Sequence, residues 1–176
     1  QSSNSLRMKT LYLVRHGKSL WDDISINDLE RPLKQRGVDN AEDLTKHLLK
    51  DNEIPDLIIS SPSVRTYETA KIIADKLKIP SSSFKVNEKL YLPDFSTLLK
   101  TILYLSDDFN SVLIVGHEPS LSTCINYFID KKLDKVITAS WTKLVFNTDA
   151  WRDISPATLK GGAHRNRRNL PGFKLE

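Results

Sequence analysis

The chain has 176 residues, and its 26 Lys and Arg residues outnumber 22 Asp and Glu residues, giving a net charge of +4. Residues 1–150 are neutral, with 20 basic and 20 acidic residues, so the excess lies in residues 151–176. Charge favours nucleic-acid binding only where it gathers on one surface. We therefore expect no nucleic-acid partner. The 39% hydrophobic content excludes a disordered chain, and the absence of a long apolar run excludes a membrane span.

The length predicts a single domain, which we assign to residues 8–155. Residues 1–7 are expected to be a disordered N-terminus or a remnant foreign to the native protein. Residues 156–176 contain two adjacent glycines and little periodicity, which predicts a basic loop or tail. Cys124 is the only cysteine, so disulfides are excluded, and with no secretion signal we expect a cytoplasmic location.

The first half of the chain alternates apolar and amphipathic segments. Residues 10–14 predict a buried strand, and residues 38–50 carry apolar side chains at the three- and four-residue spacing of a helix. Residues 56–60 predict a second strand. Ser61 and Pro62 then resemble a helix start with proline at the first helical position.

The second half continues this alternation. Residues 85–87 predict a short strand and residues 96–105 a helix. Residues 111–115 predict a further strand, followed by a helix from Pro119 and a last strand at 143–146. Strands that alternate with helices indicate an α/β fold around a mostly parallel sheet.

Two arginines and two histidines follow the predicted strands. Arg15 and His16 end the first strand, Arg65 follows the second, and His117 follows residues 111–115. Ligands of parallel sheets bind beyond the carboxyl ends of the strands. A guanidinium fork matches phosphate oxygens, and a neutral imidazole can attack phosphorus. The pattern therefore predicts phosphoryl transfer through a phosphohistidine intermediate. Metal-ligand spacings are absent, so we expect no metal and no cofactor.

Three segments resemble motifs of the histidine phosphatase superfamily. Residues 13–19 are similar to its first motif, and residues 60–70 and 115–119 to its second and third. The resemblance implies a three-layer α/β sandwich of the phosphoglycerate mutase type, with a mostly parallel central sheet flanked by helices. It also implies that His16 is the nucleophile, and that Arg15, Arg65 and His117 bind the phosphoryl group without a metal.

Within this superfamily the chain resembles the small SixA-type phosphohistidine phosphatases. Residues 28–37 are similar to a loop of that group, and the segment between Arg65 and Ser111 has no room for the insertion of phytases. Asp22 stands where mutases carry asparagine. The resemblance implies a phosphorylated protein as the partner. A small phosphorylated metabolite, such as a sugar phosphate or nucleotide, is the alternative, and a phosphoprotein-binding module with little turnover is another.

The proton donor stays open between two glutamates. Glu88 lies in a segment similar to the acid-bearing segment of the mutases, and we assign it the catalytic role. Glu118 stands where acid phosphatases place an aspartate.

We expect other conspicuous side chains to be structural. His47 is interpreted as a helix residue and His164 as an exposed residue of the tail. Trp21, Trp141 and Trp151 are interpreted as packing residues. Whether the basic segment 164–176 covers the site is left open.

Overall fold

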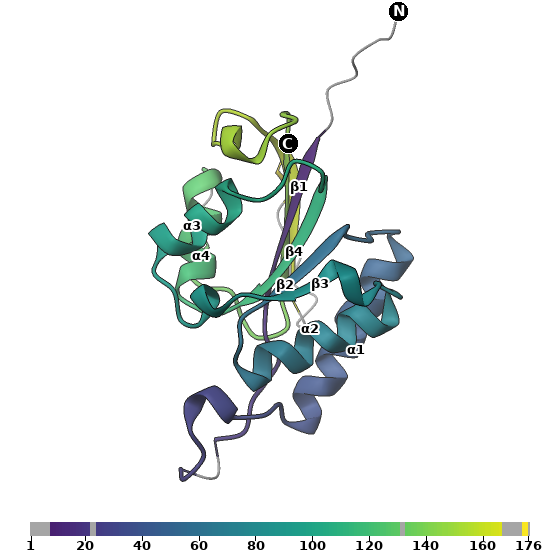
Figure 1. The fold of residues 1–176 in the computed structure, drawn as a ribbon, viewed down its shortest axis with the longest axis vertical. Coiled ribbons are helices and arrows are strands. Elements are labelled where there is room, and N and C mark those ends of the chain that lie inside the picture. The colour runs from purple at the N-terminus through teal and green to yellow at the C-terminus, as the bar shows by residue number, and fades with distance from the viewer. Residues whose placement is uncertain (1–7, 22–23, 131–132, 167–173, 176) are drawn as a thin grey trace, which may run out of the picture.

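The computed structural model describes residues 8–21, 24–130, 133–166 and 174–175. Within these residues one seven-stranded sheet runs through the molecule in the order β3-β2-β4-β1-β5-β6-β7 (Figure 1). Its strands are β1 (Lys9–Arg15), β2 (Leu57–Ser60), β3 (Phe84–Val86), β4 (Ser111–Gly116), β5 (Trp141–Phe146), β6 (Leu159–Arg165) and β7 (Lys174–Leu175).

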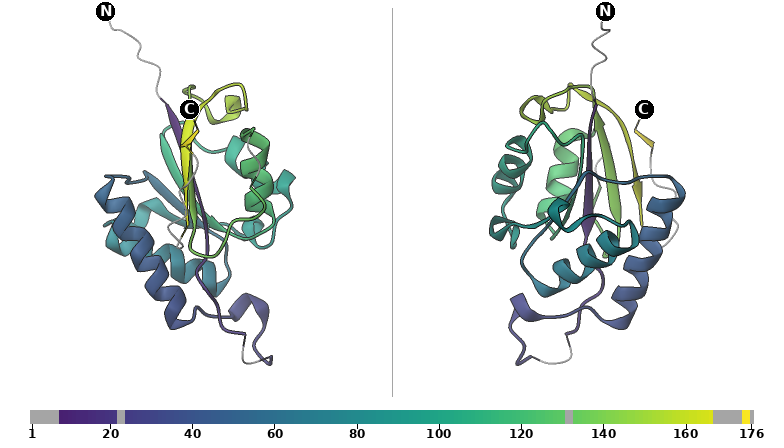
Figure 2. Two further views of the ribbon diagram at one scale, coloured as in Figure 1. Left: turned by 180° about the vertical axis from the view of Figure 1, so that it is seen from behind. Right: turned by 45° about the vertical axis from the view of Figure 1, so that its right-hand side comes forward.

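Helices cover both faces of this sheet, as Figures 1 and 2 show. The helices are α1 (Gln35–Lys50), α2 (Val64–Lys76), α3 (Phe95–Leu103) and α4 (Ser120–Phe128). Four short 3-10 turns are η1 (Asp28–Glu30), η2 (Ser81–Ser83), η3 (Glu88–Leu90) and η4 (Trp151–Asp153). The pair α1 and α2 packs on one face, and α3 with α4 on the other. The predicted three-layer α/β sandwich is therefore confirmed.

The alternating side chains of β1 divide the core into two halves. Leu11 and Leu13 pack on the side of α3 and α4, whereas Tyr12 and Val14 pack on the side of α1 and α2. Successive side chains of a strand point to opposite faces of the sheet. A strand that is apolar at odd and even positions alike therefore fits a sheet covered on both faces. Burial of each leucine contributes about 1.5–3 kcal/mol. This double coverage fixes β1 at the centre of the sheet.

The parallel half of the sheet sets where its functional side chains lie. β3, β2, β4 and β1 run parallel, with Arg15 opposite Gly116 and Ser60 opposite Val115. The residues that follow these positions therefore meet at one edge of the sheet. β5, β6 and β7 pair in antiparallel fashion beside β1.

The start of α2 differs from the sequence prediction. The helix begins at Val64, and its cap is Ser63, whose side chain accepts a hydrogen bond from the Thr66 amide. Ser61 and Pro62 therefore precede the helix. Ser61 and Ser63 both suit an N-cap. Ser63 takes this position because its hydroxyl accepts a hydrogen bond from the Thr66 amide. This later start leaves Ser61 in the turn that approaches His117.

The prediction of a loop or tail from residue 156 is wrong for residues 159–165. They form β6, which pairs with β5 over most of its length. Gly161 and Gly162 have a low intrinsic preference for strands, so the sequence of this segment does not indicate one. The strand forms because its backbone pairs with that of β5. His164, expected to be exposed, is buried, with its Nδ1 2.7 Å from Thr142 Oγ1.

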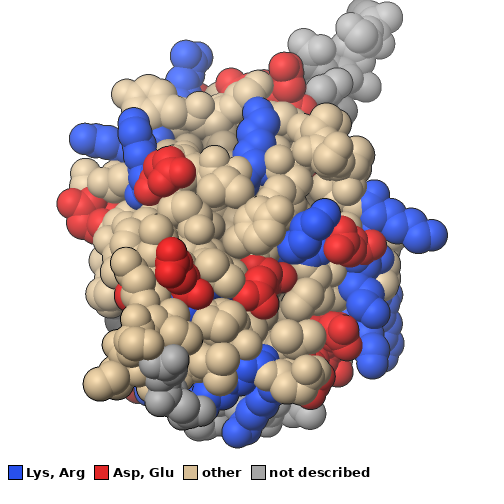
Figure 3. All heavy atoms as spheres, turned by 60° about the horizontal axis from the view of Figure 1, so that its bottom comes forward, with Lys and Arg blue, Asp and Glu red and all other residues tan. Residues whose placement is uncertain are grey.

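The predicted N-terminal extension and most of the C-terminal segment lie outside the described residues. Among the described ones, Arg165 pairs with Asp51 at 3.5 Å and does not line the cavity described below. Basic and acidic side chains both occur across the face shown in Figure 3. In the described part of the chain, no helix is long and apolar enough to cross a membrane, and no group of three His, Cys, Asp or Glu side chains is placed to hold a metal.

Candidate functional site

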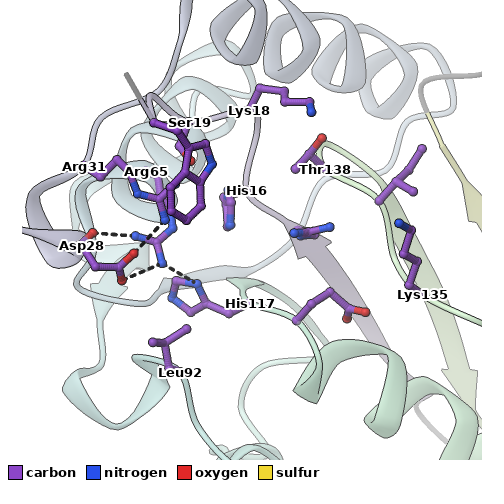
Figure 4. Close-up of a pocket in the computed structure, with 14 residues that line it drawn as sticks. His16, Lys18, Ser19, Asp28, Arg31, Arg65, Leu92, His117, Lys135 and Thr138 are labelled. Atoms are coloured by element: carbon purple, nitrogen blue, oxygen red, sulfur yellow. Dashed lines mark hydrogen bonds and ion pairs between the residues drawn. The ribbon is translucent and has the colours of Figure 1, made fainter. Parts of the chain in front are cut away.

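A cavity of about 490 Å³ opens at the carboxyl ends of β1 and β4 (Figure 4). It brings together the four residues that the sequence places at the strand ends: Arg15, His16, Arg65 and His117. Arg15 ends β1 and His16 follows it, Arg65 lies in the first turn of α2, and His117 follows β4. Parallel pairing therefore converts residues far apart in the chain into one cluster.

Two glycines let the turn after β1 lie close to α1. A Cβ at Gly17 would lie 2.6 Å from the Gly37 carbonyl oxygen, far inside normal contact distance. The Gly17 amide also donates to Thr69 Oγ1 at 3.1 Å. Side chains at either glycine would push the turn outward. The close approach thus holds His16, the preceding residue, against the sheet edge.

His16 carries a free ring nitrogen that suits a nucleophile. Its Nδ1 lies 2.7 Å from the Gly17 carbonyl oxygen, which can only accept, so Nδ1 bears the proton and Nε2 keeps its lone pair. Burial is the main cause that lowers the pKa of His16 to about 4; the Gly17 contact opposes it, and the nearby charges of Arg65 and Arg15 act in the same direction as burial. The imidazole is therefore neutral near pH 7.

His117 is held as the opposite tautomer. Its Nδ1 lies 3.4 Å from Arg65 Nη2, which can only donate, so the proton sits on Nε2 and is donated to Ser61 Oγ at 2.8 Å. Burial lowers the pKa of His117 to about 3, and Arg65 adds to the effect. The ring centroids of His16 and His117 lie 5.6 Å apart. Ser61 was not among the predicted site residues.

Three arginines line the cavity, of which Arg31 and Arg65 are buried and Arg15 is half-buried. Arg15 Nη1 donates to the Val136 carbonyl at 2.9 Å, and Arg65 Nη1 donates to the Asp28 carbonyl at 2.7 Å. Arg31 donates to the Ser19 hydroxyl. The Nε atoms of all three arginines are buried with no hydrogen-bond partner in the described structure. Three guanidinium groups at one cavity fit an oxyanion, because each offers several N–H donors to its oxygens.

Asp28 and Arg31 were missed as site residues. They lie in the loop between β1 and α1, within the segment that resembles the SixA loop. The Asp28 carboxylate pairs with Arg31 and Arg65 and accepts from the Tyr91 hydroxyl. Burial raises the pKa of Asp28, but these three donors outweigh it and hold the pKa well below its usual range. The available signals were the similarity of residues 28–37 to the SixA loop and an arginine before proline in a strand-to-helix loop.

The structure treats the two candidate acids differently. Glu118 lines the cavity, but its two oxygens accept from the Ser122 and Val136 amides at 2.8 and 3.1 Å. Glu88 is exposed in η3 and does not line the cavity. The acid role of Glu88 stays a prediction.

The rim of the cavity carries an aromatic ring and two lysines. Trp21 was predicted to be a packing residue, which is wrong: it is 69% exposed, and its ring lies 3.6 Å from the Arg31 guanidinium. Lys18 and Lys135 are exposed at the mouth of the cavity (Figure 4). Trp141 and Trp151 are buried as expected.

Comparisons with known proteins agree with this geometry. The model of the histidine phosphatase superfamily (branch 1) matches residues 11–90. An uncharacterised chloroplast protein of Arabidopsis thaliana is 29% identical over 121 residues, which are 62% of this chain and 54% of that protein. The chain thus spans about half the length of this relative.

Two solved structures share the fold. The protein histidine phosphatase SixA complexed with tungstate superposes with a TM-score of 0.71 at 18% identity, over 95% of this chain and 96% of that one. A mycobacterial glucosyl-3-phosphoglycerate phosphatase gives a TM-score of 0.64 at 16% identity, over 85% and 96%. Such low identities show a common fold alone. Residues 11–90 match the model of the histidine phosphatase superfamily, and the motif residues of the chain gather in one cavity.

Proposed function

We propose that the protein is a metal-independent phosphatase that moves a phosphoryl group to His16 and then to water, with protein phosphohistidine as the substrate class. The observation that carries the proposal is the state of His16. Its Nε2 lone pair is free, its pKa is lowered to about 4, and it faces a cavity lined by three arginines. A neutral imidazole beside cations is suited to attack a phosphoryl group.

In the first step His16 Nε2 attacks phosphorus, a nitrogen–phosphorus bond forms, and the bond to the leaving group breaks. In the second step water attacks phosphorus, the bond to Nε2 breaks, and the proton lost by water passes to the released phosphate. Arg15, Arg31 and Arg65 stabilise the negative charge of the transferring group, because fixed donors need no reorganisation during the reaction.

His117 changes its protonation state when the anion binds. In the free site burial, and after it the charge of Arg65, opposes a second proton on its ring. A bound phosphoryl dianion reverses the sign of the local charge, and so raises the pKa of His117. Nδ1 then takes a proton from solvent, gives up its contact with Arg65 Nη2 and donates to a phosphoryl oxygen, while Ser61 keeps Nε2–H in place.

The carboxylates support a nitrogen leaving group. Hydrolysis of an alkyl phosphate needs an acid for the departing oxygen. Asp28 is held ionised, both oxygens of Glu118 accept from backbone amides, and Glu88 lies outside the cavity. An imidazole leaving group can take its proton from solvent, which favours phosphohistidine.

The test is to trap the intermediate. Incubation with a phosphohistidine-bearing protein should place acid-labile, base-stable phosphate on the wild-type chain and none on His16→Ala. His47→Gln is the matched control, since His47 lies on α1 away from the cavity, and it should label like the wild type. Equal turnover by His16→Ala would sink the proposal.

A small phosphorylated metabolite is the second candidate, because a cavity of about 490 Å³ is large enough for one. Rates with phosphohistidine protein, a sugar phosphate and a nucleotide separate the two substrate classes. Faster turnover of the sugar phosphate or nucleotide would replace the protein substrate. Tight phosphoprotein binding without hydrolysis would instead indicate a binding module.

A further inference from the structure

The Asp28 carboxylate lies between two of the arginines that line the cavity (Figure 4). Its Oδ1 accepts from Arg31 Nη2 at 2.7 Å, and its Oδ2 accepts from Arg65 Nη2 at 3.1 Å. Its main-chain carbonyl accepts from Arg65 Nη1 at 2.7 Å. The Asp28 side chain is 40% exposed, whereas those of Arg31 and Arg65 are 7% and 3% exposed. One carboxylate at the cavity edge is thus shared by two buried cations and balances one of their two positive charges.

Tyr91 fixes this carboxylate in its place. The Tyr91 hydroxyl donates to Asp28 Oδ2, the oxygen that also accepts from Arg65. Asp28 therefore ties together three segments: η1, the first turn of α2 and the residue that follows η3. Arg31 Nη1, Arg31 Nη2 and Arg65 Nη1 each make one of the hydrogen bonds described above, and each carries two N–H groups, so both cations retain donors for an anion.

We propose, on the basis of the function proposed above, that Asp28 is a positioning residue with opposite effects on the transition state and on the bound product. It holds Arg31 and Arg65 in the arrangement that stabilises the transferring phosphoryl group. At the same time its negative charge weakens the hold of the cavity on free phosphate, the product.

Both effects follow from the position of the charge. Donors that are already fixed stabilise the transition state more than donors that must reorganise, so loss of Asp28 slows the chemical step. A carboxylate paired with the same arginines repels a free dianion, so loss of its charge strengthens binding of that anion. Catalysis depends on how much more strongly the cavity binds the transition state than the free phosphate. Asp28 increases this difference in binding free energy.

The experiment compares the full chain with its Asp28→Asn variant, using tungstate as the probe for anion binding and phosphoramidate as the substrate. Calorimetry should show tungstate binding at least threefold tighter in Asp28→Asn, while kcat for phosphoramidate falls at least tenfold. Glu30→Gln is the matched control, because Glu30 lies exposed in the same turn and does not line the cavity. It should leave both quantities unchanged.

Tyr91→Phe separates position from charge. It removes one contact to Asp28 and keeps the carboxylate, so kcat should fall about twofold to threefold with tungstate affinity unchanged. A general loss of structure would weaken both functions, and weaker or unchanged tungstate binding in Asp28→Asn would overturn the proposal, as would an undiminished kcat. The binding measurement needs no turnover, so failure of the phosphatase proposal would show separately, as a wild-type chain that binds tungstate without hydrolysing any substrate.

Discussion

The two walls of the cavity hold their arginines by different means. On one wall, Arg31 and Arg65 are paired with the Asp28 carboxylate. On the other wall, Arg15 donates to the neutral carbonyl of Val136. The Val136 amide in turn donates to the Glu118 carboxylate. The first wall depends on charge and on the planar fork of the guanidinium. The second depends on the backbone of the loop before β5.

The largest expected effect comes from replacing each arginine by lysine, which keeps the charge and loses the fork. Arg65 contacts Asp28 through two nitrogens and His117 through one of them. A point charge cannot reproduce this set, so Arg65→Lys should lower kcat/KM by a few hundredfold, on the order of 3–4 kcal/mol. Arg15 makes one contact to a carbonyl, so Arg15→Lys should cost only about tenfold, or 1.4 kcal/mol.

Steady-state kinetics with phosphoramidate measures both variants. Arg36→Lys serves as the control, since Arg36 is exposed on α1 and does not line the cavity. Similar losses in Arg15→Lys and Arg65→Lys would show that the two walls hold their cations equivalently, contrary to the geometry.

The next effect concerns the two histidines between the walls. Both are buried and neutral, with pKa values lowered to about 4 for His16 and about 3 for His117. The unfolded chain binds protons on these rings below its ordinary pKa of about 6.5, whereas the folded chain does not. The free energy of unfolding should therefore fall as pH drops from about 6.5 towards 4, by on the order of 3 kcal/mol for each histidine.

Urea unfolding at several pH values measures this loss. His16→Asn removes one titrating group, so its stability should fall less steeply over the same range. If both chains show the same slope, His16 is not held neutral in the folded state. The result would then weaken the argument for a free Nε2 lone pair.

The difference between the walls also explains what the sequence could predict. The register of β1 on β4 places Arg15 opposite Gly116, so His16 and His117 had to meet once both strands were recognised. The ends of the strands can be predicted from local hydrophobic patterns. Parallel pairing then brings the residues that follow these ends to one edge of the sheet. The four predicted residues therefore come together in the cavity as expected.

Asp28 and Arg31 could not be predicted in this way. They lie in a loop whose ends meet through hydrogen bonds between Leu20 and Pro32 and between Lys34 and Lys18. This closure depends on contacts between distant residues, which leave no periodic pattern in the sequence. β6 was missed for a related reason, because its pairing with β5 offsets the weak strand preference of its own residues.

A smaller effect tests the second wall through Glu118→Gln. The amide can accept from only one of the two backbone N–H groups, and the other is left facing a donor. We expect the free energy of unfolding to fall by about 1–2 kcal/mol, with kcat/KM lowered less than tenfold. Glu88→Gln should change neither quantity. A large loss of alkyl phosphate turnover in Glu88→Gln alone would instead support the acid role predicted for that residue.

The smallest effect should come from Trp21, which touches the first wall from outside. Its exposed ring lies over the Arg31 guanidinium, and an exposed cation–π contact contributes about 0.5–1 kcal/mol. Trp21→Ala should lower kcat/KM for phosphoramidate about twofold to fivefold, while Trp21→Phe keeps most of the activity because it keeps a ring over the charge. No loss in either variant would mean that Asp28 and Ser19 position Arg31 without the ring. The ion pair, and not the aromatic ring, would then set the geometry of this wall.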